Sequence, residues 1–172
     1  FYVSDDNTAT DGNPEPDSYV SYNYRDNCWS IGTISRNCWF DSFGFRKVPF
    51  AFSSSGLLYN HESGTDDAGS AISAHITSSP IEIDSAGNNL MLVDKIIPDI
   101  TMTGSLSCTV LSKKYPNDST ITKGPFTIQS DTAKISMRSR GRQVSLKLES
   151  TSLGDSWSFG DFRMNSRQDG LR

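Results

Sequence analysis

The sequence predicts an all-β protein in which part of a β-propeller, its last blade, is followed by a β-sandwich or jelly-roll domain. Helix-forming residues are scarce in the 172-residue chain, whereas Ser, Thr, Gly, Asn and Asp are abundant. Apolar residues occur singly or in alternation with polar ones and not at helical spacing. Turn-forming residues separate these short runs, and such a rhythm is typical of strands.

Residues 1–67 are expected to form the propeller part. An acidic loop with two prolines, Ser4–Ser18, comes first, and its spacing favours a solvated connection over a calcium site. Strand-like segments with turns between them follow at Tyr19–Ile31, with its own turn at Arg25–Asn27, and at Arg36–Phe40, Val48–Phe52 and Leu57–Glu62. Four short strands of this kind predict one meander sheet, which is the form of a propeller blade.

Residues 68–172 are expected to form the β-sandwich. Apolar and polar residues alternate along successive short segments, as half-buried strands require. The apolar positions are Ile72, Ala74 and Ile76; Ile81 and Ile83; Leu90 and Leu92; Leu106, Cys108 and Val110; Phe126 and Ile128; Ile135 and Met137; Val144, Leu146 and Leu148; and Trp157 and Phe159 with Phe162 and Met164. This pattern predicts two sheets whose apolar faces pack on each other.

Charge and cysteine content agree with a two-part, non-secreted chain. Residues 1–86 hold 4 Lys/Arg and 12 Asp/Glu, whereas residues 87–172 hold 12 and 8. Three cysteines leave at least one unpaired, and without zinc-type spacing they are expected to be buried free thiols in a reducing cytoplasm. No apolar run approaches membrane-spanning length. Because Phe1 opens an apolar segment that leads into an interior-type loop, we expect the C-terminal part of a longer polypeptide.

The residues that most often carry catalysis offer no recognisable constellation. Only His61 and His75 are present, and neither neighbours a plausible nucleophile. A packing role for the His61 imidazole is favoured over a catalytic dyad of His61 with Glu62. Nucleophile-elbow, phosphate-loop and zinc-protease patterns are absent. We therefore expect no enzymatic activity, no cofactor and no metal.

A basic row is the most conspicuous charge feature. In an extended chain Lys134, Arg138, Arg140 and Arg142 fall on one side, and Ile135 points to the other. Arg140–Arg142 is expected to be a turn or a bulge. The row is a candidate subunit contact or phosphate-facing surface, with a solvated strand face as the alternative. Nucleic-acid binding is less favoured because stacking aromatic residues are not interleaved with it.

Several blocks of the sequence resemble the tail nozzle or tail hub proteins of tailed, short-tailed bacteriophages, including those called DNA-stabilisation proteins. The C-terminal blocks are Arg138–Ser150, Leu153–Gly160 and Arg167–Arg172, and the upstream blocks are Cys28–Thr33, Leu58–Asp66, Ile96–Asp99 and Thr122–Phe126. They keep their order along the chain. Phe159 and Leu171 depart from the family pattern, which puts local contacts in doubt more than membership.

The resemblance implies a virion structural protein that is made in the host bacterial cytoplasm. Its partners would be copies of itself in a ring, the adaptor, portal, fibre or needle proteins of the tail, and DNA in transient contact. The chain would be the C-terminal part of a propeller-containing ring subunit through which DNA is retained and ejected. The alternative is a receptor- or carbohydrate-binding β-sandwich of the tail, with Tyr22, Tyr24, Trp29 and Trp39 as its aromatic platform. A tail depolymerase is a third and weaker interpretation.

Overall fold

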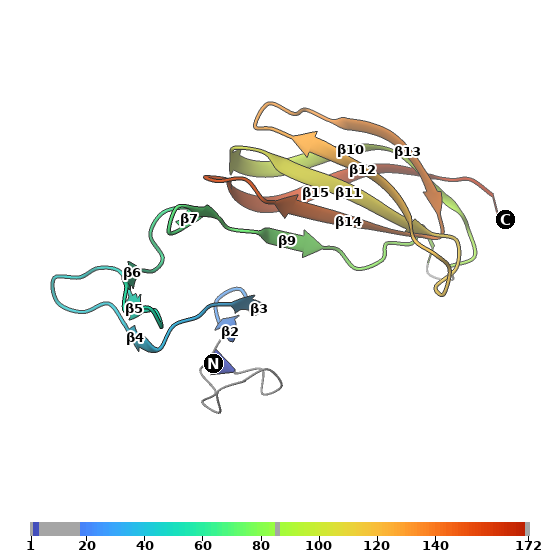
Figure 1. The fold of residues 1–172 in the computed structure, drawn as a ribbon. Coiled ribbons are helices and arrows are strands. Elements are labelled where there is room, and N and C mark those ends of the chain that lie inside the picture. Colours follow the sequence, from blue (N-terminus) through green and yellow to red (C-terminus); the bar gives the residue numbers. More distant parts are fainter. Residues whose placement is uncertain (1, 4–17, 85–86, 171–172) are drawn as a thin grey trace. The chain divides into compact units, whose positions relative to one another are not determined.

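The computed structural model describes residues 2–3, 18–84 and 87–170. Every helix or strand that it shows there is a β-strand, so the predicted all-β class is confirmed (Figure 1). The chain divides into two compact units, unit 1 (Phe1–Gly64) and unit 2 (Thr65–Arg172). The acidic loop expected at Ser4–Ser18 lies, apart from Ser18, outside the described residues. In the described ranges, no helix is long and apolar enough to cross a membrane.

Unit 1 holds two small antiparallel sheets. The first contains, in spatial order, β1 (Tyr2–Val3), β2 (Ser18–Asn23) and β3 (Cys28–Thr33). The second contains β4 (Cys38–Phe40), β5 (Phe50–Phe52) and β6 (Leu58–Asn60). Each predicted strand segment is therefore present, but the prediction of one meander sheet over these segments is wrong.

The local signals in unit 1 fix its turns without fixing the pairing of its strands. Between β2 and β3, the side-chain Oδ1 of Asn23 accepts hydrogen bonds from the backbone N–H groups of Arg25 and Asp26. Asn27 then adopts the left-handed conformation with φ 53°. Farther along, β5 pairs with both β4 and β6, and β3 pairs with β2 alone. Alternation predicts which residues share a face, whereas the choice of neighbour depends on which edges meet.

Unit 2 contains two larger antiparallel sheets and a short hairpin. The hairpin is β7 (Asp66–Asp67) with β8 (Ser70–Ala71). One sheet has the order β13 (Ile135–Gly141), β10 (Met91–Thr103), β15 (Ser156–Gln168). The other has the order β12 (Ile121–Ile128), β11 (Leu106–Lys113), β14 (Gln143–Ser150), β9 (Ala74–Thr77).

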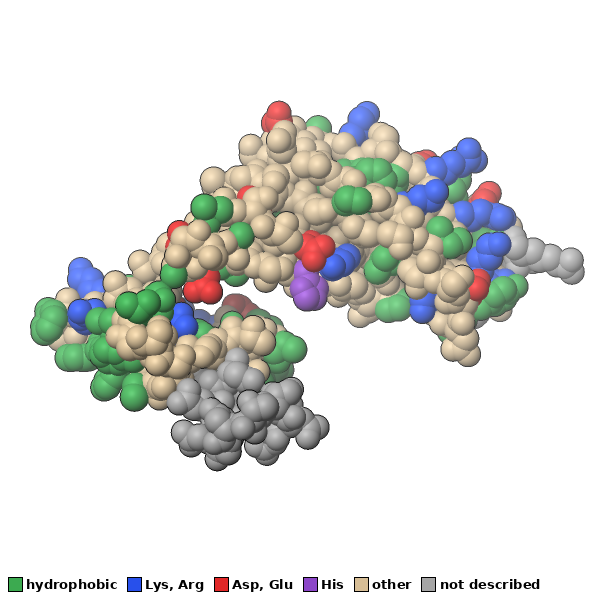
Figure 2. All heavy atoms as spheres, in the orientation of Figure 1, with side chains coloured by type: hydrophobic (Ala, Val, Ile, Leu, Met, Phe, Trp, Pro, Cys, Tyr) green, Lys and Arg blue, Asp and Glu red, His purple; other side chains and the backbone are tan. Residues whose placement is uncertain are grey.

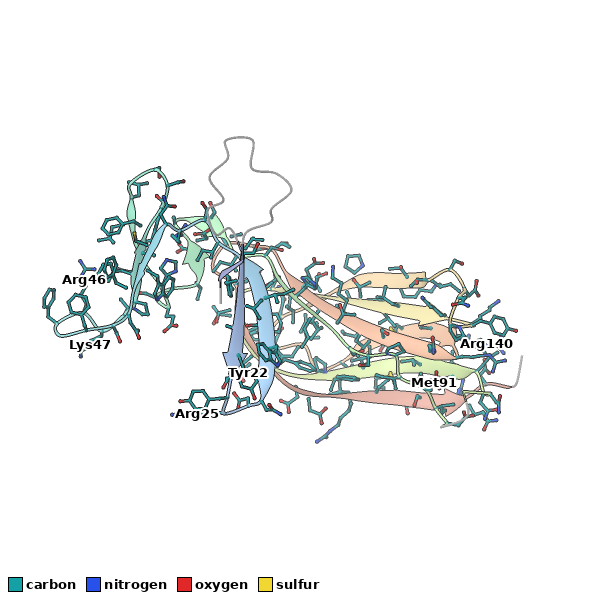
Figure 3. The ribbon with its side chains drawn as sticks, turned by 90° about the horizontal axis from the view of Figure 1, so that it is seen from below. Tyr22, Arg25, Arg46, Lys47, Met91 and Arg140 are labelled. Carbon is teal, nitrogen blue, oxygen red and sulfur yellow. The ribbon has the colours of Figure 1, made fainter. Side chains whose placement is uncertain are left out.

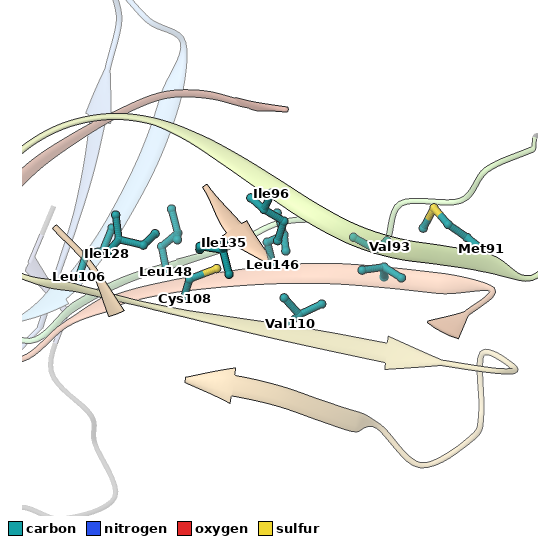
Figure 4. Close-up of a cluster of buried hydrophobic side chains, with 11 residues drawn as sticks. Met91, Val93, Ile96, Leu106, Cys108, Val110, Ile128, Ile135, Leu146 and Leu148 are labelled. Atoms are coloured by element: carbon teal, nitrogen blue, oxygen red, sulfur yellow. The ribbon is translucent and has the colours of Figure 1, made fainter. Parts of the chain in front are cut away.

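The core of unit 2 is formed by side chains from both of these sheets (Figure 4). On β14 the residues Val144, Leu146 and Leu148 are buried in strict alternation with half-buried neighbours, as the sequence predicts. The cluster comprises Met91, Val93, Ile96, Leu106, Cys108, Val110, Ile128, Ile135, Val144, Leu146 and Leu148. The inner faces of the two sheets thus share one apolar core.

Two predicted strand segments of unit 2 differ from the structure. The segment at Ile81 and Ile83 is no strand, because only Ile81 makes an isolated bridge, to Val144. Pro80 precedes this bridge and has no N–H to donate to a ladder. The segment Ala71–Ile76 is divided between β8 and β9.

Gly141 marks the point where the chain leaves one sheet of unit 2 for the other. It ends β13, and after Arg142 the chain continues as β14 in the opposite sheet. A Cβ atom on Gly141 would lie 2.8 Å from the carbonyl oxygen of Lys113 and 3.1 Å from the Cβ of Ser112. The expected turn or bulge at Arg140–Arg142 is therefore a turn whose backbone approach requires glycine.

Gly141→Ala is expected to lower the free energy of unfolding by about 2 kcal/mol, because the added methyl group overpacks a backbone contact. Urea unfolding followed by circular dichroism measures this change. Ser136→Ala, at an exposed position of the same strand, is the matched control and should leave the midpoint almost unchanged. Equal stability of the two variants would contradict the close approach at Gly141.

Candidate functional site: a basic pocket and an aromatic surface

The predicted basic row lies on and beside β13. Lys134 is exposed just before the strand, and Arg138 and Arg140 are exposed on it. Ser139, between the two arginines, is buried, as is Ile135 on the same inner side. The alternation that placed the arginines on the outer side of this strand thus follows the two-residue period of an extended chain.

Two residues of the row are engaged inside unit 2. The Nε of Arg140 lies 2.6 Å from the Oδ2 of Asp169, and its Nη2 donates to the Asp169 carbonyl oxygen at 2.8 Å. Arg142 donates to the carbonyl oxygens of Gly87 and Asn88, and its guanidinium lies 5.3 Å from the ring centroid of Tyr115. These contacts tie β13 and the turn after it to segments far away in the sequence. Charge reversal at Arg140 or Arg142 would therefore disturb the unit itself.

The structure brings Arg138 and Arg140 together with two lysines that the sequence did not single out. Lys114 lies just after β11 and Lys123 lies on β12, and both of these strands belong to the sheet that does not contain β13. The four cations line a pocket of about 340 Å³, together with Asp169 and the buried residues Leu90, Leu92, Ser112 and Ser139. We call this site the basic pocket. Arg140 is labelled in Figure 3, close to Met91, at the end of unit 2 where β10 begins.

Sequence reasoning missed Lys114 and Lys123 because their contribution depends on packing between the two sheets. Along β12, residues 121–125 are all exposed, so no alternation marks Lys123. Lys114 stands beside Lys113 in a stretch that reads as an ordinary solvated turn. The only available signal was the positive charge of the second half of the chain, which names no residue.

Unit 1 exposes a large share of its apolar side chains. Among residues 18–64, only Pro49 and Ala51 are buried. Large hydrophobic side chains exposed in this unit are Tyr22, Tyr24, Trp29, Ile31, Trp39, Phe40, Phe43, Phe45, Phe52, Leu57 and Leu58, with Phe45 86% and Ile31 81% exposed. Figure 2 shows hydrophobic side chains gathered on the visible surface of this unit.

An aromatic patch lies along β4, β5 and the connection between them. The ring centroids of Phe43 are 6.3 Å from Phe45 and 6.0 Å from Phe50, and Phe40 stacks on Phe50 at 5.0 Å. The guanidinium of Arg46, labelled in Figure 3, lies 4.9 Å from the Phe50 ring centroid. These rings contact one another, so they present a connected apolar surface.

The four residues predicted as an aromatic platform are spread over β2, the turn after it, β3 and β4. Tyr22 and Trp29 face each other across the β2–β3 ladder with centroids 4.5 Å apart. Tyr24 lies in the turn that follows β2, and Trp39 belongs to the other sheet of unit 1. The Tyr22–Trp29 pair is therefore the part of the platform that the fold assembles.

His61, the histidine considered for a dyad, packs against an aromatic ring. Its ring centroid lies 4.5 Å from that of Trp39, and its Nε2 accepts a hydrogen bond from the Nε of Arg36 at 3.2 Å. The residues around it, among them Tyr19 and Glu62, line a pocket of about 340 Å³ in unit 1. In the described part of the chain, no group of three or more His, Cys, Asp or Glu side chains is placed to hold a metal ion.

The cysteines differ in their surroundings. Cys108 is a buried member of the core of unit 2, whereas Cys28 and Cys38 are exposed in unit 1, and all three thiols are free. The expectation of buried thiols is therefore wrong for Cys28 and Cys38, because the unit that carries them buries few side chains.

Comparison with known proteins assigns the chain to no group. No protein-family model matches it, and no curated protein matches it.

Proposed function

We propose that the chain is a structural subunit of a phage tail, a nozzle or hub protein whose copies form a ring through which DNA is retained and ejected. The observation that carries this proposal is the apolar surface of unit 1, where only Pro49 and Ala51 are buried among residues 18–64. Exposed apolar surface of this extent marks a protein interface. The resemblance of the sequence blocks to phage tail proteins indicates that the assembly is a ring in a phage tail.

We assign the partner on this surface to a neighbouring copy of the same chain. A ring needs a heterologous interface, in which two different surfaces of identical subunits meet. One of these surfaces is the aromatic patch of unit 1, which supplies buried area.

The finer fold assignment belongs to the same proposal. We assign unit 2 to the β-sandwich class, which is supported by two antiparallel sheets that share one apolar core. We assign β4, β5 and β6 to part of a propeller blade, which is supported by their antiparallel order and their aromatic faces. The hairpin of β2 and β3 would then be a separate element of the interface.

The test is the oligomeric state of the full chain in solution, measured by sedimentation velocity. We expect a discrete closed oligomer for the wild type and a monomer for the double variant Phe43→Ser with Phe45→Ser, because both side chains are exposed and belong to the aromatic patch. Leu153→Ser is the matched control, since Leu153 is an exposed apolar residue of unit 2 and its loss should leave assembly intact. A monomeric wild type would contradict the ring.

The second candidate function is glycan or receptor binding on the tail, and the Tyr22–Trp29 pair favours it. Both rings are exposed and lie side by side on one face of the hairpin, as sugar-stacking residues do. Binding of host-surface glycans by the full chain, lost in Trp29→Ala and retained in the Phe43 and Phe45 double variant, would select this function over ring assembly.

A further inference from the structure

The basic pocket combines four cationic side chains from two sheets around one small space. Arg138 and Arg140 come from β13, Lys123 comes from β12 in the other sheet, and Lys114 comes from the segment that follows β11. Among the described residues that line the pocket, Asp169 is the only one with a carboxylate, and it forms an ion pair with Arg140. Among the residues described, none forms an ion pair with Lys114, Lys123 or Arg138. Like charges held around a concave space repel one another and raise the local concentration of anions.

A buried hydroxyl group without a partner lies in the wall of the same pocket. Ser139 is 2% exposed, and its Oγ has no hydrogen-bond partner within the described part of the chain. The other buried serine of the wall, Ser112, donates its hydroxyl to the carbonyl oxygen of Ile121 at 3.3 Å. A buried hydroxyl that makes no hydrogen bond costs stability, so its retention requires a reason. An acceptor atom supplied by a ligand would satisfy it.

We propose that the basic pocket binds an oxyanion of the size of phosphate, independently of the assembly that unit 1 supports. The oxygen atoms of a phosphate accept charge-assisted hydrogen bonds from guanidinium and ammonium groups, and one more from the Ser139 hydroxyl. Among the described lining residues, four cations and one carboxylate leave three positive charges unbalanced. Such an excess suits a phosphate dianion better than a single carboxylate. The ligand is a discrete phosphate group, free or on a small molecule.

Nucleic acid is the less favoured occupant of this site. None of the described residues that line the pocket is aromatic, so these residues offer bases no surface on which to stack. The four cations line one pocket of about 340 Å³. One phosphate group fits this arrangement, whereas a chain of phosphates needs an extended surface.

The experiment is isothermal titration calorimetry of the full chain with inorganic phosphate at low ionic strength. Arg138→Gln and Lys123→Gln are each expected to lower the affinity at least about tenfold, since each removes one charge-assisted contact. Lys134→Gln is the matched control, because Lys134 belongs to the basic row and does not line the pocket. Its affinity should equal that of the wild type.

Ser139→Ala separates a binding role from a structural one. Removal of an unpartnered buried hydroxyl should leave the unfolding midpoint without phosphate unchanged or raised, while it lowers phosphate affinity several-fold. A lowered midpoint with unchanged affinity would overturn the role of Ser139 as a ligand. Circular dichroism in the absence of phosphate measures the midpoint and confirms that each variant is folded.

Three further ligands identify the source of the bound group. If a nucleoside monophosphate binds with the same affinity as inorganic phosphate, the site is assigned to a small phosphorylated molecule. If inorganic phosphate binds and the nucleoside monophosphate does not, the site is assigned to the free ion. Succinate that binds as tightly as phosphate would overturn the preference for phosphate. Tight binding of single-stranded DNA with none of inorganic phosphate would overturn the proposal, as would equal losses in Lys134→Gln and Arg138→Gln.

Discussion

Leu106→Ala is expected to lower the free energy of unfolding of unit 2 by about 3 kcal/mol, because it opens a cavity in a core that cannot fully collapse around it. Leu106 is 1% exposed and lies opposite Ile128 in the β11–β12 ladder. It belongs to the buried cluster to which both sheets contribute side chains (Figure 4). The lost contacts therefore belong to the packing of one sheet on the other and not to one strand alone.

Leu153→Ala, elsewhere in unit 2, is the matched control for this change. It removes the same atoms from a side chain that is 60% exposed, so its effect should remain within about 0.5 kcal/mol. Urea unfolding of both variants, followed by tryptophan fluorescence, gives the two free energies. Equal losses at Leu106 and Leu153 would contradict a core that contains Leu106 and leaves Leu153 outside.

The two-residue period of the sequence predicts unit 2 well because its strands each have one face on a shared core. The inward residues of β11 and β14 alternate without a break, and their burial follows directly from the printed sequence. In unit 1 the same kind of alternation yields the strands but not their partners. The strands of unit 1 are short and bury few side chains, so burial does little to determine which strand pairs with which.

Strand irregularities in unit 2 explain where the alternation changes phase. The apolar positions of β15 shift from odd numbers at Trp157 and Phe159 to even numbers at Phe162 and Met164. The register of β15 against β10 shifts at the same point, between Asp99 and Ile100. One extra residue in a ladder moves every later side chain to the other face. A shift in the sequence pattern therefore marks a bulge and need not mark the end of a strand.

Pro98 shows why the length of β10 was not predictable. A proline normally argues against a central strand, because it cannot donate a ladder hydrogen bond. The structure contains it within Met91–Thr103, where pairing with β13 ends at Ile96 and only β15 continues alongside. At Pro98 one edge of β10 is therefore outside the ladder with β13, and the missing N–H is tolerated. That local arrangement depends on where another strand stops.

The candidate site also has a part that the sequence predicts and a part that depends on tertiary packing. The outward spacing of Arg138 and Arg140 follows from the period of β13, and so does the inward position of Ser139. The contribution of Lys114 and Lys123 depends on contact between two sheets, which no local pattern encodes. The ion pair of Arg140 with Asp169 joins residues 29 positions apart in the sequence. Periodicity thus predicts the face of a residue, and tertiary packing decides which faces form a pocket.

Cys108 should make the stability of unit 2 fall as the pH rises from about 9 to about 11. Burial raises the pKa of the Cys108 thiol from its ordinary value of 9.0 to about 11, because the thiolate loses its hydration in the core. Between these two values the unfolded chain releases the thiol proton while the folded chain keeps it. Its contribution is therefore fully present below pH 9 and is lost as the pH approaches 11. The expected loss is about 2 to 3 kcal/mol.

Urea unfolding across this pH range should show a smaller decline for Cys108→Ala than for the wild type, whatever its absolute stability. All other side chains are the same in both proteins, so the difference in slope isolates the Cys108 thiol. Cys28→Ser keeps the buried thiol and should keep the wild-type slope. Thiol labelling of the folded chain should modify Cys28 and Cys38 first and Cys108 much more slowly, because Cys108 is buried and the other two thiols are exposed. Parallel slopes in wild type and Cys108→Ala, with fast labelling of all three thiols, would mean that the core around Cys108 is open to water.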